Sequence, residues 1–277
     1  MVEMIEGLVI DLDGTVYRGN EAIEGAIETI SRLKAAGTKV VFLSNRGNIS
    51  RKMCREKLSS MGLDVSEEEI LLASTIAARY LRAHGEGRKV WVLGEQGLID
   101  ELCIAGVPLA ERPEDAGWLL ITLHERLTYQ DLNLSFRAVR HGARIIATNS
   151  DRMFPGEGGD CIDVAGMIGA IVHATAQDVE IVVGKPYSLM AEAALETLGL
   201  PPERCLVIGD SLESDIRLGH AAGMRTALVL TGSTDLRDVR LSPIQPKYIW
   251  NSIRDVSSVL GIERSENELR EEKGSHI

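Results

Sequence analysis

Short apolar runs alternate with longer segments of helical periodicity along almost the whole chain. The apolar runs occupy residues 8–10, 40–43, 89–93, 118–123, 144–147, 180–183, 205–208, 226–230 and, as an edge strand, 247–250. The segments in which apolar residues recur every three or four positions are 22–35, 50–61, 97–104, 129–140, 163–176, 189–198 and 214–222. Strands that alternate with helices are typical of a mainly parallel sheet, so the pattern predicts an α/β fold.

Three stretches do not follow this alternation. The sequence SEEE at 66–69 has the form of a capping box, although the residues after it favour neither helix nor strand. The sequence TNSDRMFPGEGGDCID at 148–163 is polar and rich in glycine, and we expect a long functional loop there. Residues 263–277 are polar, which predicts a frayed C-terminal tail.

The strands that end in chemically reactive side chains come from the two flanks of the chain. The middle series of strands and helices looks complete in itself. We therefore predict a split catalytic core of residues 1–85 and 178–262, with an α/β domain inserted at 86–177. The polar stretches at 85–87 and 177–179 are the expected hinges of this insert.

Composition and charge exclude several classes of partner. The 277 residues include 30 Lys and Arg against 41 Asp and Glu, a formal net charge of -11, and only 4% are aromatic. Neither a basic patch nor a set of stacking platforms is present, so we expect no nucleic-acid partner. No stretch is apolar enough to span a bilayer, and the N-terminus lacks the basic region of a secretory signal. The four scattered cysteines have no metal-binding spacing and predict reduced core thiols in a cytoplasmic protein.

Polar side chains directly follow four of the apolar runs. These stretches are LVIDLDGT at 8–15, VVFLSNRG at 40–47, IVVGKPY at 181–187 and LVIGDSLESD at 206–215. In an open parallel sheet the carboxyl ends of the strands line one crevice, where ligands bind. The side chains expected to meet there are Asp11, Asp13, Ser44, Asn45, Lys185, Asp210 and Asp215.

The acids of this set predict a site for a hard divalent cation. Burying several carboxylates without a partner is unfavourable, and Mg²⁺ prefers oxygen ligands. The carboxylates of Asp11 and Asp210 and the backbone carbonyl of Asp13 could supply such ligands. A cation held there would offset the negative charge and attract a phosphate oxygen.

The remaining groups of the set predict a phosphate site beside the cation. Lys185 would add a positive charge, and Ser44 would donate a hydrogen bond. The backbone amides near Asn45 and Gly14 would donate further hydrogen bonds to phosphate oxygens. A cup of this kind stabilises the charge on a phosphoryl group during its transfer.

In four ordered motifs the chain resembles the haloacid dehalogenase superfamily of phosphohydrolases. The motifs are Asp11-Leu12-Asp13-Gly14-Thr15, Ser44-Asn45, Gly184-Lys185-Pro186, and Gly209-Asp210 followed by Asp215. The chain is similar in particular to the NagD-like branch, the p-nitrophenyl phosphatase family, up to about residue 261. This resemblance implies a Rossmann-like parallel-sheet core with an inserted α/β cap of type C2.

The resemblance also implies catalytic roles. Asp11 would be the nucleophile and form an aspartyl-phosphate. Asp13 would protonate the leaving alcohol and then activate the attacking water. Lys185 would bridge the nucleophile and the phosphate. A carboxylate nucleophile divides the displacement into two easier steps, which agrees with these roles.

The same resemblance assigns the binding residues. Ser44 and Asn45 would hold the phosphoryl group. Asp210 would bind Mg²⁺ together with Asp11 and Asp13. Asp215 would support the metal, either as a direct ligand or from just behind the ligands, because it is also well placed to cap a helix.

Substrate recognition is expected to involve residues outside the shared motifs. Related sequences often have Asn-Asn after the Thr or Ser of the second motif, whereas this chain has Asn45 and Arg46 after Ser44, followed by Gly47 and Asn48. Arg46 is either a ligand for a second anionic group of the substrate or a solvated charge, and Gly47 would let the backbone approach a ligand. Asn149 and Asp151 could hydrogen-bond the leaving group in the loop of the insert, and Phe154 could pack on it.

The predicted function is a Mg²⁺-dependent phosphomonoesterase acting on a small metabolite, with p-nitrophenyl phosphate as a surrogate. Nucleoside monophosphates, sugar phosphates and phosphoglycolate are candidate substrates, and a homodimer formed through the cap is a further expectation. A phosphotransferase or mutase on the same scaffold is one alternative. A phospho-accepting regulatory module is another, although such modules need neither a second acid like Asp13 nor an inserted domain. The full set of acids argues against a catalytically silent binding protein.

Overall fold

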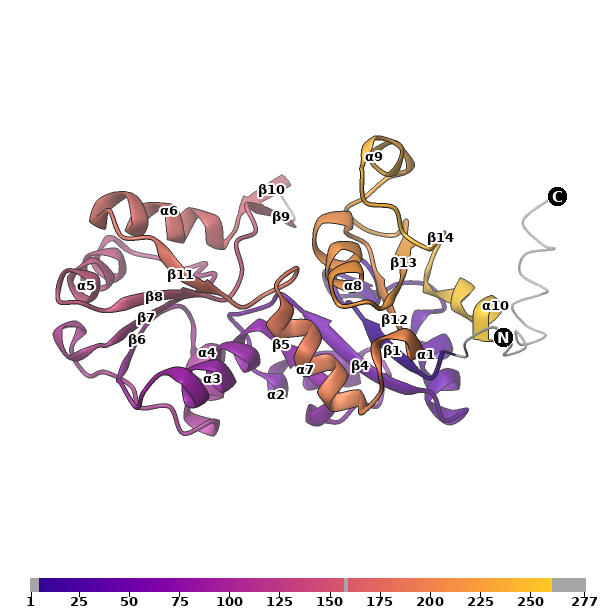
Figure 1. Ribbon diagram of the computed structural model, residues 1–277, viewed down its shortest axis with the longest axis horizontal. Helices are drawn as coiled ribbons and strands as arrows, with labels where there is room; N and C mark the ends of the chain where they lie inside the picture. The colour runs from indigo at the N-terminus through magenta and orange to yellow at the C-terminus, as the bar shows by residue number, and fades with distance from the viewer. Residues whose placement is uncertain (1–4, 157–158, 261–277) are drawn as a thin grey trace. The chain divides into compact units, whose positions relative to one another are not determined.

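The computed structural model describes residues 5–156 and 159–260, and its contacts form two compact units (Figure 1). Unit 1 comprises Met1–Val40 and Leu200–Ile277, and unit 2 comprises Val41–Gly199. The predicted tail at 263–277 and the last two residues of the predicted core lie outside the described residues.

Unit 1 is organised around parallel strands in the order β14-β13-β12-β1. Every residue of β1 and β12 is buried, which explains why both read as continuous apolar runs. Strand β4 begins beside β1, where the Lys39 amide donates to the Glu6 carbonyl oxygen (N···O 3.1 Å). The strands of unit 1 are β1 (Gly7–Ile10), β2 (Tyr17–Arg18), β3 (Glu21–Ala22), β12 (Cys205–Gly209), β13 (Arg225–Val229) and β14 (Tyr248–Trp250).

The helices of unit 1 bury one face each. In α1 the buried residues are Ala26, Thr29, Ile30 and Leu33, a spacing that places them on one stripe of the helix. Asp235 begins α9 with a capping box, because its side chain accepts from the Asp238 amide and the Asp238 carboxylate accepts from the Asp235 amide. The helices of unit 1 are α1 (Ala26–Ala35), α8 (Arg217–Ala221), α9 (Leu236–Leu241) and α10 (Ser257–Leu260).

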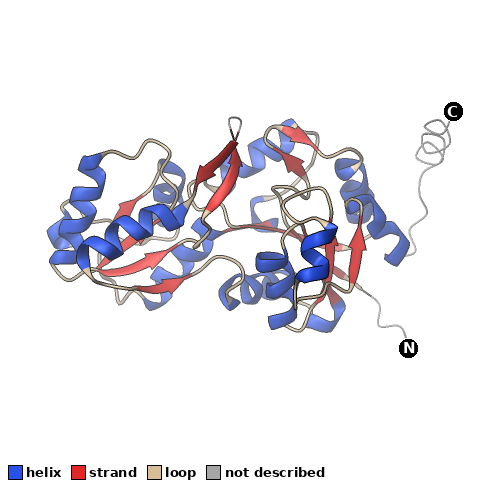
Figure 2. Ribbon diagram, turned by 90° about the horizontal axis from the view of Figure 1, so that it is seen from above, coloured by secondary structure: helices blue, strands red, loops and turns tan. Residues whose placement is uncertain are grey.

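Unit 2 contains the end of β4, which pairs in parallel with β5, and a separate four-stranded parallel sheet in the order β11-β8-β7-β6. Figure 2 shows the helices around this sheet. Helices α5 and α6 pack on it through an apolar cluster that includes Leu119, Ile145 and Met167. The strands are β4 (Lys39–Ser44), β5 (Ile70–Leu72), β6 (Val90–Leu93), β7 (Trp118–Ile121), β8 (Arg144–Ala147), β9 (Met153–Gly156), β10 (Gly159–Ile162) and β11 (Val179–Val182).

Side-chain caps define where several helices of unit 2 begin. Ser50, Thr128 and Asp163 each accept a hydrogen bond from a backbone amide near the start of the following helix. The helices are α2 (Arg51–Ser60), α3 (Ala73–His84), α4 (Gln96–Ile104), α5 (Tyr129–Arg140), α6 (Val164–Thr175) and α7 (Ser188–Leu198).

The predicted α/β fold with parallel strands is confirmed, but one strand was assigned to the wrong sheet. The run before Lys185 forms β11, and it pairs with β8 rather than with the strand that precedes Asp11. An apolar run of four residues fits any parallel sheet equally well, so its own sequence does not select its neighbour. The proposed insert at 86–177, with the core at 1–85 and 178–262, stays a prediction.

The apolar pattern did not predict β2, β3, α9 and α10, nor the elements of two further regions. The capping box at 66–69 forms, but it opens a short 3-10 turn that leads into β5 and then α3. Within the expected loop at 148–163, β9 and β10 pair as antiparallel strands, and Phe154 lies opposite Cys161. Among the described helices, none has the length and apolar character needed to cross a membrane. Cys54 and Cys205 are buried as expected, whereas the Cys103 side chain is exposed.

Candidate active site

Two carboxylates of unit 1 lie side by side because their strands are parallel neighbours. Ile10 of β1 is in register with Ile208 of β12, and the Asp11 amide continues this ladder by donating to the Ile208 carbonyl oxygen at 2.9 Å. Asp11 follows β1 directly and Asp210 follows β12 directly. The parallel register therefore delivers both acids to the same edge of the sheet.

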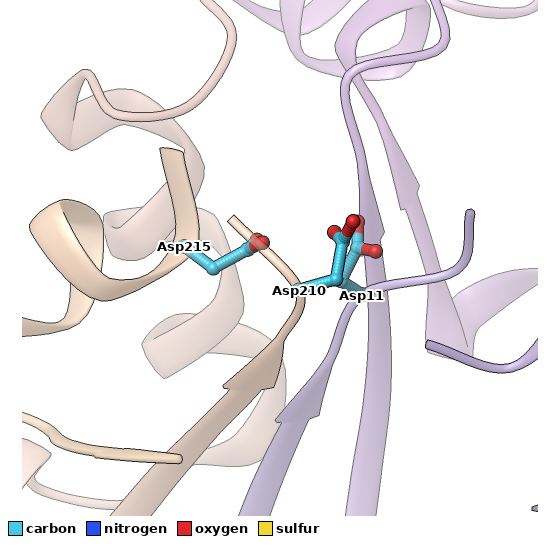
Figure 3. Close-up of side chains that lie close together, drawn as sticks. All are labelled: Asp11, Asp210 and Asp215. Atoms are coloured by element: carbon cyan, nitrogen blue, oxygen red, sulfur yellow. The ribbon is translucent and has the colours of Figure 1, made fainter. Parts of the chain in front are cut away.

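A third carboxylate reaches this edge from a helical turn. Residues 212–216 form a π-helical turn after β12, and this turn contains Asp215. One oxygen of Asp215 accepts a hydrogen bond from the Ser211 amide at 3.1 Å, which fixes the direction of the side chain. Figure 3 shows the Asp215 carboxylate pointing toward the carboxylates of Asp11 and Asp210.

The three carboxylates form a compact buried group. One oxygen from each lies within 4.8 Å of the others. The residues Asp11, Asp210 and Asp215 are only 6%, 8% and 1% exposed. Three anionic oxygen donors at this spacing fit a hard divalent cation, since such a cation offsets the repulsion among buried like charges.

Two glycines let the backbone approach the Asp210 carboxylate closely. A side-chain carbon at Gly14 would lie 2.6 Å from an Asp210 oxygen, and one at Gly232 would overlap that carboxylate. Gly14 also has a φ of 81°, a left-handed conformation that glycine adopts without strain. The space beside the Asp210 carboxylate is thus lined by backbone, and the predicted phosphate-binding residue Gly14 belongs to this lining.

The loop after β13 contributes residues that the sequence analysis did not assign to the site. The Ser233 amide donates to an Asp210 carboxylate oxygen at 2.5 Å, and the Ser233 hydroxyl lies 3.3 Å from the Asp210 carbonyl oxygen. The Thr231 hydroxyl donates to the Gly14 carbonyl oxygen at 2.7 Å. The polar sequence TGST directly after an apolar strand was the feature that could have identified this loop.

Asp13 is held differently from the three clustered acids. Its carboxylate accepts a hydrogen bond from the hydroxyl of Tyr17, with an O···O distance of 3.3 Å. Tyr17 is almost fully buried, whereas Asp13 is half-buried. The predicted metal contact through the Asp13 carbonyl stays a prediction.

Unit 2 brings together the predicted residues Ser44 and Lys185. Both are buried, at 3% and 4% exposure. The Lys185 ammonium donates to the carbonyl oxygen of Leu43 at 3.3 Å, so the lysine lies along the end of β4. The Ser44 hydroxyl accepts a hydrogen bond from the Arg46 amide at 3.2 Å.

The side chain of Asn45 connects three segments of unit 2. Its oxygen accepts from the Lys185 amide at 2.7 Å, and its nitrogen donates to the Lys185 carbonyl oxygen at 3.2 Å. The same nitrogen donates to a carboxylate oxygen of Asp151 at 2.9 Å. Asn149 donates to the Asn45 carbonyl oxygen and accepts from the Asp151 amide, both at 2.9 Å.

A mixed group of charges lies next to this network. The Arg46 guanidinium carbon is 6.0 Å from the centre of the Phe154 ring. Burial, with a smaller contribution from the Asp151 carboxylate, raises the pKa of Asp163 to about 6, and the Val164 amide and the Arg46 charge counteract this rise. Asp163 itself was not a predicted site residue, because the sequence showed it only as the first residue of the helical segment 163–176.

Gly47 has a packing role that the sequence did not indicate. A side-chain carbon there would overlap the hydroxyl groups of Thr122 and Thr148, which are hydrogen-bonded to each other at 2.9 Å. The close approach that requires glycine is therefore to the ends of β7 and β8. A contact of Gly47 with a ligand stays a prediction.

The structure thus assembles the predicted residues in two groups, one in each unit. Unit 1 contains Asp11, Asp13, Gly14, Asp210 and Asp215. Unit 2 contains Ser44, Asn45, Arg46, Gly47, Asn149, Asp151 and Lys185.

Two family models match the chain. One describes haloacid dehalogenase-like hydrolases and matches residues 8–108, and the other describes HAD-hydrolase-like proteins and matches residues 182–256. The chain is 56% identical to the sugar phosphatase AraL of Bacillus subtilis over 253 residues, which cover 91% of this chain and 92% of that protein.

Solved structures show the same similarity. The p-nitrophenyl phosphatase from Archaeoglobus fulgidus has a TM-score of 0.87 and 34% identity, covering 93% of this chain and all of that one. NagD from E. coli K-12 has a TM-score of 0.82 and 28% identity, covering 94% of this chain and 99% of that one. With these similarities and the ordered acidic motifs, the chain belongs to the haloacid dehalogenase-like hydrolases, as a phosphatase of the NagD-like branch.

Proposed function

We propose that this phosphatase hydrolyses the phosphomonoesters of small sugars, with Mg²⁺ as cofactor and an aspartyl-phosphate at Asp11 as intermediate. The observation that carries the proposal is the buried group of Asp11, Asp210 and Asp215, whose oxygens lie within 4.8 Å of one another. Only oxygen donors are present in this group, which favours Mg²⁺ over softer metals. When bound there, the ion would supply positive charge that attracts and stabilises the phosphate.

In the first step, a carboxylate oxygen of Asp11 attacks phosphorus, and the bond from phosphorus to the ester oxygen breaks. Asp13 transfers its proton to that oxygen, so the product leaves as an alcohol. The Tyr17 hydroxyl, hydrogen-bonded to Asp13, holds the carboxyl group in place for this transfer. The result is an acyl phosphate on Asp11 and an ionised Asp13.

In the second step, Asp13 accepts a proton from a water molecule as the water oxygen attacks phosphorus. The bond between phosphorus and the Asp11 oxygen then breaks. Inorganic phosphate leaves, the Asp11 carboxylate is regenerated, and Asp13 is protonated again. Asp13 thus gives one proton to the leaving alcohol in the first step and takes one from water in the second.

Ser44 and Lys185 are the further residues that we expect to act on the phosphate. Ser44 would donate a hydrogen bond to a phosphoryl oxygen, and the Lys185 ammonium would neutralise part of the developing charge. Both side chains are buried, so their contribution would be less screened by solvent than that of surface groups.

A sugar is the leaving group that the remaining residues of unit 2 fit. Asp151 offers hydrogen-bond acceptors for hydroxyl groups, Arg46 offers donors, and the Phe154 ring offers an apolar face. The relative that is 56% identical is a sugar phosphatase, which supports the same substrate class. Dimerisation through the predicted cap and a cytoplasmic location stay predictions.

The test is turnover of p-nitrophenyl phosphate by the full chain, with both p-nitrophenol and inorganic phosphate measured. We expect equal amounts of the two products with Mg²⁺, no turnover in EDTA, and full recovery when Mg²⁺ is restored. Ca²⁺ should support turnover poorly, because its larger and looser coordination shell would misplace the reacting groups. Full activity in the chelator would contradict the proposal.

The two products also distinguish hydrolysis from phosphoryl transfer. In the presence of a sugar acceptor, a transferase or mutase would release p-nitrophenol in excess of inorganic phosphate. A phosphatase would keep the ratio at one. A panel of pentose phosphates, hexose phosphates, nucleoside monophosphates and phosphoglycolate would then rank the substrate classes.

A further inference from the structure

One amide side chain pairs with both backbone polar groups of Lys185. The Asn45 oxygen accepts from the Lys185 amide (2.7 Å), and the Asn45 nitrogen donates to the Lys185 carbonyl oxygen (3.2 Å). The Lys185 ammonium donates to the Leu43 carbonyl oxygen (3.3 Å). Lys185 is therefore held at its backbone and at its tip by the two residues that flank Ser44.

The same amide nitrogen also binds the Asp151 carboxylate. The N···O distance is 2.9 Å, and Asn45 is separated from Asp151 by 106 residues along the chain. Asn149 strengthens this connection because it bridges the Asn45 carbonyl oxygen and the Asp151 amide. Asn45 thus joins the chain segments that follow β4, β8 and β11.

Gly184 provides the space that this arrangement needs. A side-chain carbon at position 184 would lie 2.8 Å from the Asn45 oxygen, 2.6 Å from the Thr148 carbonyl oxygen and 2.9 Å from the Asn149 side chain. Each of these separations is shorter than an ordinary van der Waals contact. The backbone before Lys185 can therefore approach Asn45 only because position 184 is glycine.

We propose that Asn45 is a positioning residue whose side-chain amide holds Lys185 in register with Ser44 and with Asp151, rather than a ligand of the phosphoryl group. This inference rests on the proposed function, in which Lys185 neutralises charge on the transferring group. Both ends of the Asn45 amide are already engaged within the protein. Its loss acts on catalysis through the position of Lys185.

A positioning role and a phosphate-binding role predict different kinetics. Misplacing Lys185 weakens an interaction that is strongest in the transition state, so kcat falls while KM changes little. Loss of a phosphate ligand would also weaken binding of inorganic phosphate as a product inhibitor. Inorganic phosphate is therefore a useful second probe.

The test is an exchange of the two partners, N45D combined with D151N. In N45D, two carboxylates face each other across the former hydrogen bond, and the donor to Asp151 is lost. In the double variant, an amide at position 151 can donate to the carboxylate at position 45, which still accepts from the Lys185 amide but cannot donate to the Lys185 carbonyl oxygen. D151N alone keeps an acceptor for the Asn45 nitrogen and is the matched control.

With p-nitrophenyl phosphate and saturating Mg²⁺, we expect N45D to lower kcat by about tenfold or more, with KM changed by less than about threefold. The double variant should be faster than N45D but slower than D151N, because the donor to the Lys185 carbonyl oxygen is not restored. The inhibition constant of inorganic phosphate should vary by less than about threefold throughout. Thermal unfolding confirms that each variant is folded. If N45D does not fold, the double variant is compared directly with D151N.

A folded double variant that stays as slow as N45D would overturn the proposal, as would a rise in the phosphate inhibition constant that matches the loss of kcat. Turnover by D11N is measured in the same assay. If D11N is inactive and the exchange fails, the positioning role alone is wrong. If D11N is active, the proposed mechanism itself is wrong.

Discussion

The two groups of predicted site residues hold their polar atoms in opposite ways. In unit 1, Asp11, Asp210 and Asp215 bring three like charges within 4.8 Å of one another. In unit 2, Asn45 and Asn149 bind backbone groups and one carboxylate through neutral amides that donate and accept at once. The first arrangement calls for a cation, whereas the second is built from protein atoms alone.

Because of this difference, the two groups should respond to different perturbations. A cluster of like charges responds to metal removal and to any change that moves a carboxylate. An amide network responds to changes of shape and of donor–acceptor pattern, because its hydrogen bonds require defined partners. The predictions below use this contrast.

The largest effect should follow Asp11→Asn. Asparagine has the same shape but is not a nucleophile, so kcat for p-nitrophenyl phosphate should fall by about four orders of magnitude. The thermal midpoint should not fall, because one like charge leaves the acidic group. Residual turnover within tenfold of the unaltered protein would show that Asp11 is not the nucleophile.

The acidic group was predictable from sequence because its members lie directly after apolar strands. Asp11 and Asp210 each follow a fully buried run, and parallel pairing of those runs is enough to bring them together. Asp215 is five residues from Asp210, within the reach of one helical turn. Local pattern and one rule of sheet geometry therefore define most of this group.

The amide network could not be predicted, because it depends on pairings between distant segments. Asn45, Asp151 and Lys185 become neighbours only after β4, β8 and β11 have taken their places. The sequence predicted that Asn45 and Lys185 meet at one crevice, but it did not predict that the Asn45 amide binds the backbone of Lys185. Nor does an asparagine show in the sequence whether its amide faces a ligand or the backbone.

Asp163→Asn tests a buried acid that lies beside the amide network. Its pKa is raised to about 6, mainly by burial, so the folded protein binds the proton more tightly than the unfolded chain. Stability due to this group is therefore present below about pH 4 and lost as the pH rises through 6. Asparagine does not ionise, so the variant avoids the stability that is lost when the buried carboxyl is charged, and its side chain can still cap α6. The free energy of unfolding at pH 8 should therefore rise by up to about 3 kcal/mol.

The measurement is the free energy of unfolding from urea titrations at pH 4.5 and pH 8. The gain should shrink at the lower pH, where the Asp163 carboxyl is protonated in the folded protein. A gain in the free energy of unfolding that does not depend on pH would show that the raised pKa of Asp163 is not its cause. The charged groups that act on this carboxyl are Asp151 and Arg46, and Asp163→Asn alters neither of them.

Two glycine substitutions compare the groups directly. Gly232→Ala would push a methyl group into the Asp210 carboxylate, and Gly184→Ala would push one against the Asn45 amide. Each should lower kcat by about 10- to 30-fold, the equivalent of about 1.4–2 kcal/mol of overpacking. Only Gly232→Ala should also raise the Mg²⁺ concentration needed for half-maximal activity.

The control for both is Gly169→Ala, on α6, where a side-chain carbon would meet nothing within 4 Å. This change should leave kcat and the Mg²⁺ requirement unaltered and add about 0.5–1 kcal/mol of stability, as alanine does in a helix. Equal shifts in the Mg²⁺ requirement for Gly232→Ala and Gly184→Ala would remove the distinction between the two groups.

The smallest effect should come from the contact between Arg46 and Phe154. A guanidinium over a partly exposed aromatic ring is stabilised by about 0.5–1 kcal/mol, which corresponds to a two- to fivefold change in rate or affinity. Phe154→Leu removes the ring but keeps apolar bulk, whereas Phe154→Tyr keeps the ring and serves as the matched control.

If Arg46 orients a sugar, Phe154→Leu should lower kcat/KM for pentose and hexose phosphates by this factor and leave kcat/KM for p-nitrophenyl phosphate unchanged. A loss that is equal for all esters would mean that Arg46 acts on the phosphoryl group rather than on the leaving group. Equal behaviour of the Leu and Tyr variants would mean that the ring does not orient Arg46 at all.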